Sequence, residues 1–342
     1  MSQSLQSFKS QFNESLLRLL WSHWASLGVS GYGDVINPVI DPEALILITA
    51  TVGRYDPRLF DAMIEWIMEN ERLVSISRIK TILKKESFSC TQIIPAIAEI
   101  VSEKGNTTKW KKFVSEKKTG TLQSLFLDRS GSFSGKDTDP FFLKYGFERP
   151  LFHKRDLVTS FSLKTPATLH LRLRSFFGVN ARSEIVAYLL SNKTGVARDI
   201  SRYSYYFLRT IQDALSEMAS SGVLISKNVP GKKREIQYSL AGNEMVNMFS
   251  YERTENKSIC WAALYLALEK IFNLINNKDF EEYSEILQNS ELRRIEREYL
   301  SDMFNRSGID IVLPEGSSYP GTEYKSQVYK FIAEKLFNRL IF

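Results

Sequence analysis

Cysteine is scarce in this sequence: the 342 residues contain only Cys90 and Cys260. The two lie far apart in the chain and form neither a CxxC pair nor the spacing of a metal site. A chain of this kind has no disulfide framework, which fits a reducing compartment. We therefore expect a cytoplasmic protein.

Long apolar runs are also lacking. The most apolar helix candidate, Ile259 to Ile275, contains Glu269 and Lys270, so it is too short and too polar to span a bilayer. The first residues, MSQSLQSFKSQFNES, lack the basic start, apolar run and cleavage site of a signal peptide. We expect a soluble protein with no membrane partner.

Motifs for catalysis or cofactor binding are missing too. The three histidines, His23, His153 and His170, have no ligand partners at metal spacing. The stretch GVSGYGD (28–34) lacks the Gly-Lys-Ser/Thr ending of a phosphate loop, and the serines of DRSGSFSGKD are not part of a GxSxG elbow. We predict no enzymatic activity, no metal and no cofactor. An enzyme of unrecognised type at residues 1–103 is the weakest alternative.

The net charge of +6 is unevenly distributed along the chain. Residues 1–102 carry 9 Lys and Arg against 11 Asp and Glu, and residues 251–342 carry 12 against 15. Between them, residues 103–182 carry 16 against 7, and residues 183–250 carry 8 against 6. A polyanion would be drawn to the middle of this chain.

Helical periodicity dominates what is present, and it predicts a mainly α, multidomain fold. Asp41 and Asp56, each followed by proline, are typical helix starts. Residues 1–103 read as a helical domain of unknown role. Residues 104–164 contain KWKKFVSEKKTG and a stretch rich in Gly, Ser and Asp, which predict a basic helix followed by a flexible, exposed connector.

Residues 251–342 return to helical patterns. The stretch SICWAALYLALEKIFNLI is apolar on most sides, so it must be buried in a core or in an oligomer interface. One side carries Ile259 and Leu266, which would stay exposed in a monomer, and this predicts a homodimer surface. In the alternative, the last two helices, over 290–305 and 323–342, cover the stretch within one chain.

Residues 165–250 form the most informative part. KTPATLHLRLRSFFGVN alternates like a strand, but Pro166 and Gly178 are typical of a helix start and stop, so we favour a helix. RSEIVAYLLSN and GVARDISRYS then predict two short helices, and a longer one follows. Gly222 ends that helix, and VLISKN and REIQYSL predict two strands around a Pro230-Gly231 turn.

Three helices and a two-stranded hairpin follow one another in the order of a winged helix-turn-helix domain. The run ISRYSYYFLRTIQDALSEMASSGVLISK resembles bacterial and archaeal winged-helix transcription regulators, such as the arsenic-responsive and multiple-antibiotic-resistance repressors. The resemblance implies that Ile211, Leu215 and Met218 anchor a recognition helix over about 204–221. It also implies that Gly222 turns the chain into the wing, and that the domain binds duplex DNA, usually as a dimer.

Physical reasoning gives the same segment a role at DNA. A helix in the major groove reads bases from its first turns, and cations on a wing contact phosphates. The residues expected to contact DNA are Ser204, Tyr205, Tyr206, Arg209, Thr210 and Gln212 on the helix, with Lys232, Lys233 and Arg234 on the wing at 230–234. We predict a transcription regulator. The alternative is a protein–protein interaction module, such as an antitoxin or a complex scaffold.

Overall fold

The computed structural model describes residues 4–31, 33–34, 36, 38–114, 122–127, 137–229, 231, 235–249 and 258–341. The chain is 66% helix and 7% strand, with a small sheet, so the predicted mainly α class is confirmed. No helix in this part of the chain is both long and apolar enough to cross a membrane.

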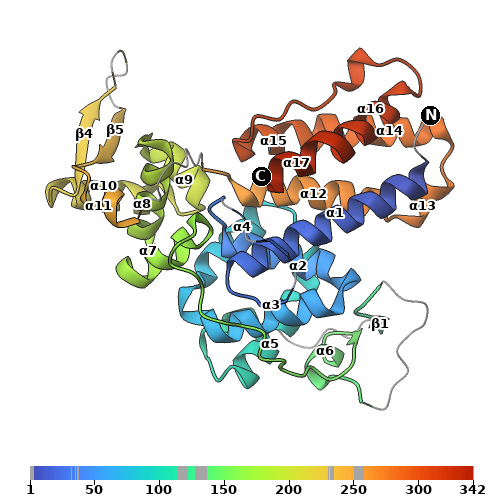
Figure 1. The fold of residues 1–342 in the computed structure, drawn as a ribbon, viewed down its shortest axis with the longest axis horizontal. Helices are drawn as coiled ribbons and strands as arrows, with labels where there is room; N and C mark the ends of the chain where they lie inside the picture. The colour runs from blue at the N-terminus through green and yellow to red at the C-terminus, as the bar shows by residue number, and fades with distance from the viewer. Residues whose placement is uncertain are drawn as a thin grey trace.

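The largest hydrophobic core joins the two ends of the chain, and we call this part the body (Figure 1). Phe8 stacks on Tyr329 with ring centroids 3.7 Å apart, which links the first helix to one of the last. The main helices of the body are α1 (Leu5–Ser26), α2 (Pro42–Val52), α3 (Pro57–Asn70), α4 (Ile76–Lys85), α5 (Ile94–Lys104), α12 (Trp261–Ile275), α13 (Lys278–Glu282), α14 (Glu285–Ile295), α15 (Ser301–Ser307), α16 (Glu323–Phe331) and α17 (Phe337–Ile341).

The predicted helix starts at the two Asp-Pro pairs are confirmed. Asp41 accepts from the Ala44 amide at 3.1 Å and so caps α2. Asp56 caps α3 through the amides of Arg58 and Leu59. A side-chain acceptor at this position satisfies backbone donors that have no partner within the helix. In contrast, α14 begins at Glu285 and is capped by Ser284, which is earlier than the pattern suggested.

Helix α12 lies in the centre of the body, against α1, α2 and α15. Leu266 is only 1% exposed, and Ile259 is half-buried. The dimer surface predicted on this helix is therefore wrong, because neighbouring helices of the same chain already cover it. The apolar character of the stretch is that of a core helix.

Residues 104–164 pack on the body in part where the structure describes them, while residues 153–156 and 162–164 are exposed. A short 3-10 helix, Lys109–Phe113, stands where a basic helix was expected. The short helix α6 (Pro140–Leu143) follows, and β1 (Gln123–Ser124) pairs in parallel with β2 (Phe147–Glu148). Aromatic residues of this segment belong to the core of the body: Trp110, Phe142, Phe147 and Phe152. Most of the Gly- and Ser-rich stretch lies outside the described residues.

Residues 169–249 form a second part with its own core, which we call the middle module. It projects from the body on the left of Figure 1. In the sequence, it lies between the two chain segments that form the body. Its elements are α7 (Leu169–Phe177), α8 (Ala181–Asn192), β3 (Thr194–Val196), α9 (Ala197–Ser204), α10 (Leu208–Ser220), β4 (Leu224–Asn228), β5 (Ile236–Leu240) and α11 (Glu244–Phe249). The ambiguous segment after Pro166 is a helix, as favoured.

The sheet of the middle module has the antiparallel order β3-β5-β4. The predicted hairpin is formed by β4 and β5, while β3 had no counterpart in the sequence analysis. Gly195 of β3 lies opposite Tyr238 of β5, and this pairing ties the base of the hairpin to the helices. Strands β4 and β5 extend away from the helices of the module (Figure 1).

Helix α10 is held to the module by one apolar face. Ile211, Leu215 and Met218 are buried there, as predicted from their spacing. Gly222 follows with φ +76°, a left-handed conformation that glycine adopts without strain. The chain thus turns directly from α10 into the hairpin, and the opposite face of α10 is left to solvent.

Candidate nucleic-acid interface

The solvent face of α10 carries three of the predicted contact residues. Arg209, Thr210 and Gln212 are all exposed, and the side chain of Arg209 is 83% exposed. They lie in the first two turns of the helix, on the side opposite its buried face. These side chains are therefore accessible to a large partner.

Three other predicted contact residues do not point outward. Ser204 and Tyr205 are buried, and Tyr206 is half-buried. The reason is the chain path: Ser204 ends α9, and Tyr205 has φ +58°, so the turn before α10 is directed into the body. Direct contacts to bases or phosphates from Ser204 or Tyr205 are excluded in this arrangement.

The wing cations Lys232, Lys233 and Arg234 lie outside the described residues. The strands beside them are described, and Lys227 of β4 is exposed. Ile225 and Ile236 are exposed on the same hairpin. The hairpin therefore has an accessible surface of mixed polar and apolar character.

Ion pairs reduce the positive charge available around α10. Arg209 pairs with Asp213 at 3.1 Å, one helical turn further on. Arg182 of α8 pairs with Glu217 of α10. Both pairs are exposed, so each contributes little to stability and can exchange partners.

Part of the positive charge of residues 103–182 is paired with acidic residues of the body. Arg149 is buried and pairs with Asp61 at 2.7 Å. Lys144 pairs with Glu99 at 2.5 Å. These contacts join a basic segment to acidic residues of the N-terminal helices, so the charge distribution along the sequence overstates the positive field.

An apolar side chain also marks the start of α10. Phe207, the residue before the helix, is 70% exposed, and the neighbouring Leu208 is also exposed. Phe207 precedes Ile211 by four residues, a spacing that would place it on the same buried stripe. The stripe instead begins at Ile211.

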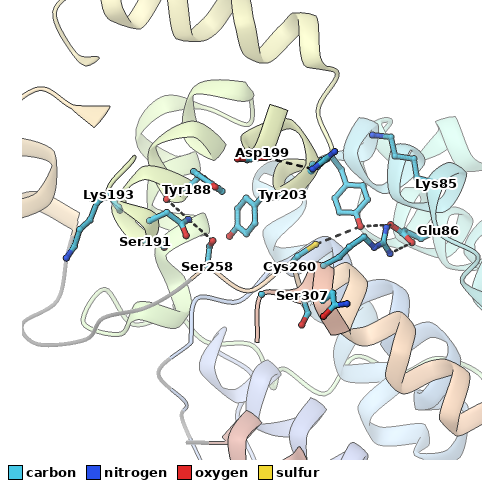
Figure 2. Close-up of a pocket in the computed structure, with 17 residues that line it drawn as sticks. Lys85, Glu86, Tyr188, Ser191, Lys193, Asp199, Tyr203, Ser258, Cys260 and Ser307 are labelled. Carbon is cyan, nitrogen blue, oxygen red and sulfur yellow. Dashed lines mark hydrogen bonds and ion pairs between the residues drawn. The ribbon is translucent and has the colours of Figure 1, made fainter. Parts of the chain in front are cut away.

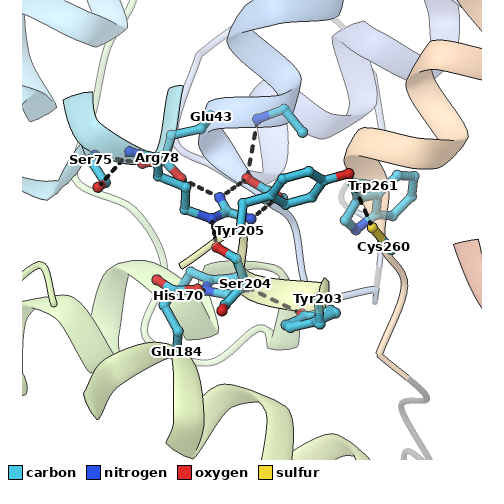
Figure 3. A network of polar contacts seen from close by, with 12 residues as sticks. Glu43, Ser75, Arg78, His170, Glu184, Tyr203, Ser204, Tyr205, Cys260 and Trp261 are labelled. Carbon is cyan, nitrogen blue, oxygen red and sulfur yellow. Dashed lines mark hydrogen bonds and ion pairs between the residues drawn. The ribbon is translucent and has the colours of Figure 1, made fainter. Parts of the chain in front are cut away.

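Buried charges hold the middle module against the body, and sequence analysis missed them. We call this cluster the joint: Asp41, Glu43, Arg78, Arg174 and Glu184. Figure 3 shows Glu43, Arg78 and Glu184 of this cluster. Arg78 of α4 contacts both Asp41 and Glu43 of the α2 start, at 2.5 Å and 2.6 Å. Its Nε also donates to the Ser204 carbonyl at 2.7 Å, which reaches the module.

The second arginine of the joint completes the link. Arg174 of α7 lies 2.7 Å from Glu43 of the body and 2.8 Å from Glu184 of α8. Both carboxylates therefore share it. Because the pairs are buried and supplied with extra hydrogen bonds, removal of one member leaves an uncompensated charge in the interior.

Asp41, Glu184 and Arg78 of the joint are charged at neutral pH. Burial acts to raise the pKa of Asp41, but the Arg78 guanidinium outweighs it and holds that pKa below its usual range. The same competition, with Arg174 as the main partner, holds the pKa of Glu184 well below its usual range. Burial acts to lower the pKa of Arg78, but the carboxylates of Asp41, Glu184 and Glu43 outweigh it and hold that pKa well above its usual value.

Tyr205 fixes the turn between α9 and α10 to the body. Its hydroxyl donates to Glu86 at 2.7 Å, and Glu86 also binds the guanidinium of Arg306 at 2.8 Å and 2.9 Å. The Tyr205 ring lies within 6.0 Å of the Arg78 guanidinium. Burial and the nearby Glu86 raise the pKa of Tyr205, so the phenol stays neutral and remains a donor.

One signal in the sequence could have indicated the joint. Glu43 lies in PEALILITATV and Arg174 in LHLRLRSFF, both helices rich in apolar residues. Charged residues are almost never fully buried unless they are paired. An acid and a base in two such helices therefore predict a buried pair, although not which residues meet.

Comparison of the chain with protein-family models, with curated proteins and with solved structures gave no match.

Proposed function

We propose that this chain binds duplex DNA through a winged helix-turn-helix formed by the middle module, and that it acts as a transcription regulator. The observation that carries the proposal is the free face of α10 beside a projecting hairpin. Arg209, Thr210 and Gln212 are exposed on that helix, and its other face is buried in the module core. A helix held in this way can enter a major groove.

The order of elements supports the proposal. Helices α8, α9 and α10 are followed by β4 and β5, and the tight turn before α10 is fixed by Tyr205. Arg209 has the geometry for a bidentate contact with guanine, and Gln212 for one with adenine. Arg209 would exchange its exposed pair with Asp213 for a base or a phosphate.

The cations that would attract DNA phosphates are not part of the joint. Lys227 on β4 is exposed, and the sequence places Lys232, Lys233 and Arg234 at the tip of the same hairpin. Each cation that neutralises a phosphate releases counterions from DNA. The proposed wing therefore makes binding strongly dependent on salt.

The test is the affinity of the full chain for arbitrary duplex DNA at several salt concentrations. The proposal predicts that the logarithm of the affinity falls linearly with the logarithm of the salt concentration. A random-sequence duplex measures the non-specific part, and selection from a randomised pool then finds the preferred site. Absence of duplex binding at low salt would overturn the proposal.

A protein–protein interaction module is the second candidate, and Phe207 favours it. A phenylalanine that is 70% exposed beside an exposed Leu208 is a suitable anchor for an apolar pocket on another protein. Phe207→Ser separates the two functions. Loss of a protein partner with unchanged duplex affinity would assign this surface to protein binding.

A further inference from the structure

A large cleft lies between the middle module and the body, away from the free face of α10 (Figure 2). Its volume is about 1030 Å³, and α8 and α9 line it on one side. The end of α4, Cys260 and the end of α15 line it on the other. Pockets for small ligands commonly have volumes of about 300–1,000 Å³, so this cleft has room for a molecule of that size.

The lining of the cleft is unusually rich in tyrosine. The rings of Tyr188 and Tyr203 meet edge to face with centroids 5.4 Å apart, and Tyr205 lines the wall near Glu86. Burial raises the pKa of each of these phenols, so they are neutral at physiological pH. They present aromatic surface and hydroxyl groups without repelling an anion.

Cations outnumber carboxylates around the cleft. Its lining includes Lys85, Lys193, Arg202 and Arg306, against Glu86 and Asp199. Glu86 is already occupied by Arg306 and Tyr205, and Asp199 reaches Arg202 only at 4.0 Å. Within the described part of the chain, neither Lys85 nor Lys193 has a carboxylate within 4.0 Å.

We propose that this cleft binds a mononucleotide. The base packs against Tyr188 and Tyr203, and the phosphate is held by the cations Lys85 and Arg202, whereas Lys193 lies at the opposite side of the cleft from Lys85 (Figure 2). Stacking on tyrosine suits any base, and the amide of Asn305 in the same lining can bind its polar edge. An apolar aromatic molecule would leave the cations unused, and inorganic phosphate would leave the aromatic wall unused.

The wall of the cleft is directly linked to α10 through the chain. Tyr205 forms part of its wall, and two residues separate Tyr205 from the first residue of α10. A phosphate that attracts Lys85 or Arg306 competes with the contacts that hold Tyr205 in its left-handed conformation. Nucleotide binding therefore changes the position of α10. This regulatory consequence, unlike the binding itself, rests on the proposed function.

Binding is tested on the full chain without DNA, by calorimetric titration with AMP, GMP, CMP and UMP. At least one mononucleotide should bind more than tenfold tighter than its nucleoside and more than tenfold tighter than inorganic phosphate. The variant Lys85→Gln should lose at least tenfold in affinity. The control is Lys84→Gln, an exposed neighbour outside the lining, which should bind as the wild type does.

The aromatic wall is tested by two substitutions of one residue. Tyr203→Leu should abolish the preference for a nucleotide over phosphate, whereas Tyr203→Phe retains the ring and should keep it. Thermal unfolding of both variants establishes that they fold before binding is measured. Equal losses in both variants would assign Tyr203 a packing role and overturn the stacking.

The inference fails if none of the four mononucleotides binds at about 5 mM, a concentration that detects even a weak complex. It also fails if a single-stranded oligonucleotide binds more tightly than any mononucleotide and the lysine variant loses that binding. Nucleotide binding without any duplex binding would support the nucleotide site in the cleft and refute the proposed function. Duplex binding that no mononucleotide alters would refute the regulatory step alone.

Discussion

The joint and the free face of α10 both contain arginines paired with carboxylates, but in opposite surroundings. Arg78 and Arg174 are buried, and each contacts two carboxylates. Arg209 and Arg182 are exposed, and each pairs with one carboxylate, of Asp213 and Glu217 respectively. Arginine–carboxylate pairs therefore fix the module at the joint but leave the side chains available on α10, because only burial prevents water from replacing the partner.

The comparison predicts its largest effect at Arg78. Replacing it in Arg78→Met leaves Asp41 and Glu43 buried without this partner, so the free energy of unfolding should fall by about 3–5 kcal/mol. Urea denaturation measures this loss. The matched control, Arg209→Met, removes an exposed pair and should change stability by less than about 0.5 kcal/mol.

A rescue variant keeps this prediction testable even if Arg78→Met does not fold. Adding Asp41→Asn and Glu43→Gln removes the uncompensated charge and should recover part of the lost stability. If the triple variant is no more stable than the single one, packing rather than charge would explain the role of Arg78.

Acid should destabilise the folded chain through the joint. The pKa values of Asp41 and Glu184 are lowered in the folded chain, so these groups stabilise it above their unfolded values of 3.8 and 4.5. This contribution is lost as pH falls from those values through the folded ones. Glu184→Gln should therefore show a smaller loss of unfolding free energy between pH 5 and pH 3 than the wild type.

The wing should affect DNA binding and leave the fold unchanged. Replacing Lys232, Lys233 and Arg234 by alanine should weaken binding to all duplexes alike. The loss of about three phosphate contacts should make the salt slope smaller by roughly 2–3 units. Fluorescence anisotropy at increasing salt measures the slope, and an unchanged slope would assign the hairpin to another partner.

Arg209→Ala should have the smallest and most specific effect. If Arg209 reads a base, the variant should lose about 1–3 kcal/mol on the preferred site and relax the preference at one base position. Gln212→Ala is the matched variant on the same face and should relax a different position. A uniform loss across sequences would identify Arg209 as a phosphate contact.

Local rules in the sequence predicted much of the fold. The Asp-Pro starts of α2 and α3, the apolar stripe of α10 and the β4–β5 hairpin follow from capping and periodicity, which act between near neighbours. The body did not follow from such rules, since its core joins residues far apart in the chain. The pattern of α12 was equally consistent with a core helix and an interface.

The candidate site was predicted only in part, for the same reason. Arg209, Thr210 and Gln212 lie on the face that helical spacing indicates. Ser204 and Tyr205 do not, because Arg78 and Glu86 of the body hold the turn that contains them. Tertiary contacts therefore determine the direction of these two side chains, and the residues that make the contacts lie far from α10 in the sequence.

The central place of α12 has a consequence for synthesis of the chain on the ribosome. Helices α1 and α2 leave the ribosome before α12 does. Helix α12 packs against both of them but is made only after the middle module. About 200 residues separate α2 from α12. At a translation rate of roughly 5–20 residues per second, the apolar surfaces of α1 and α2 that α12 covers stay exposed for about 10–40 seconds. The middle module has its own core and can fold during that delay, so the nascent body is the part that most needs protection by a chaperone.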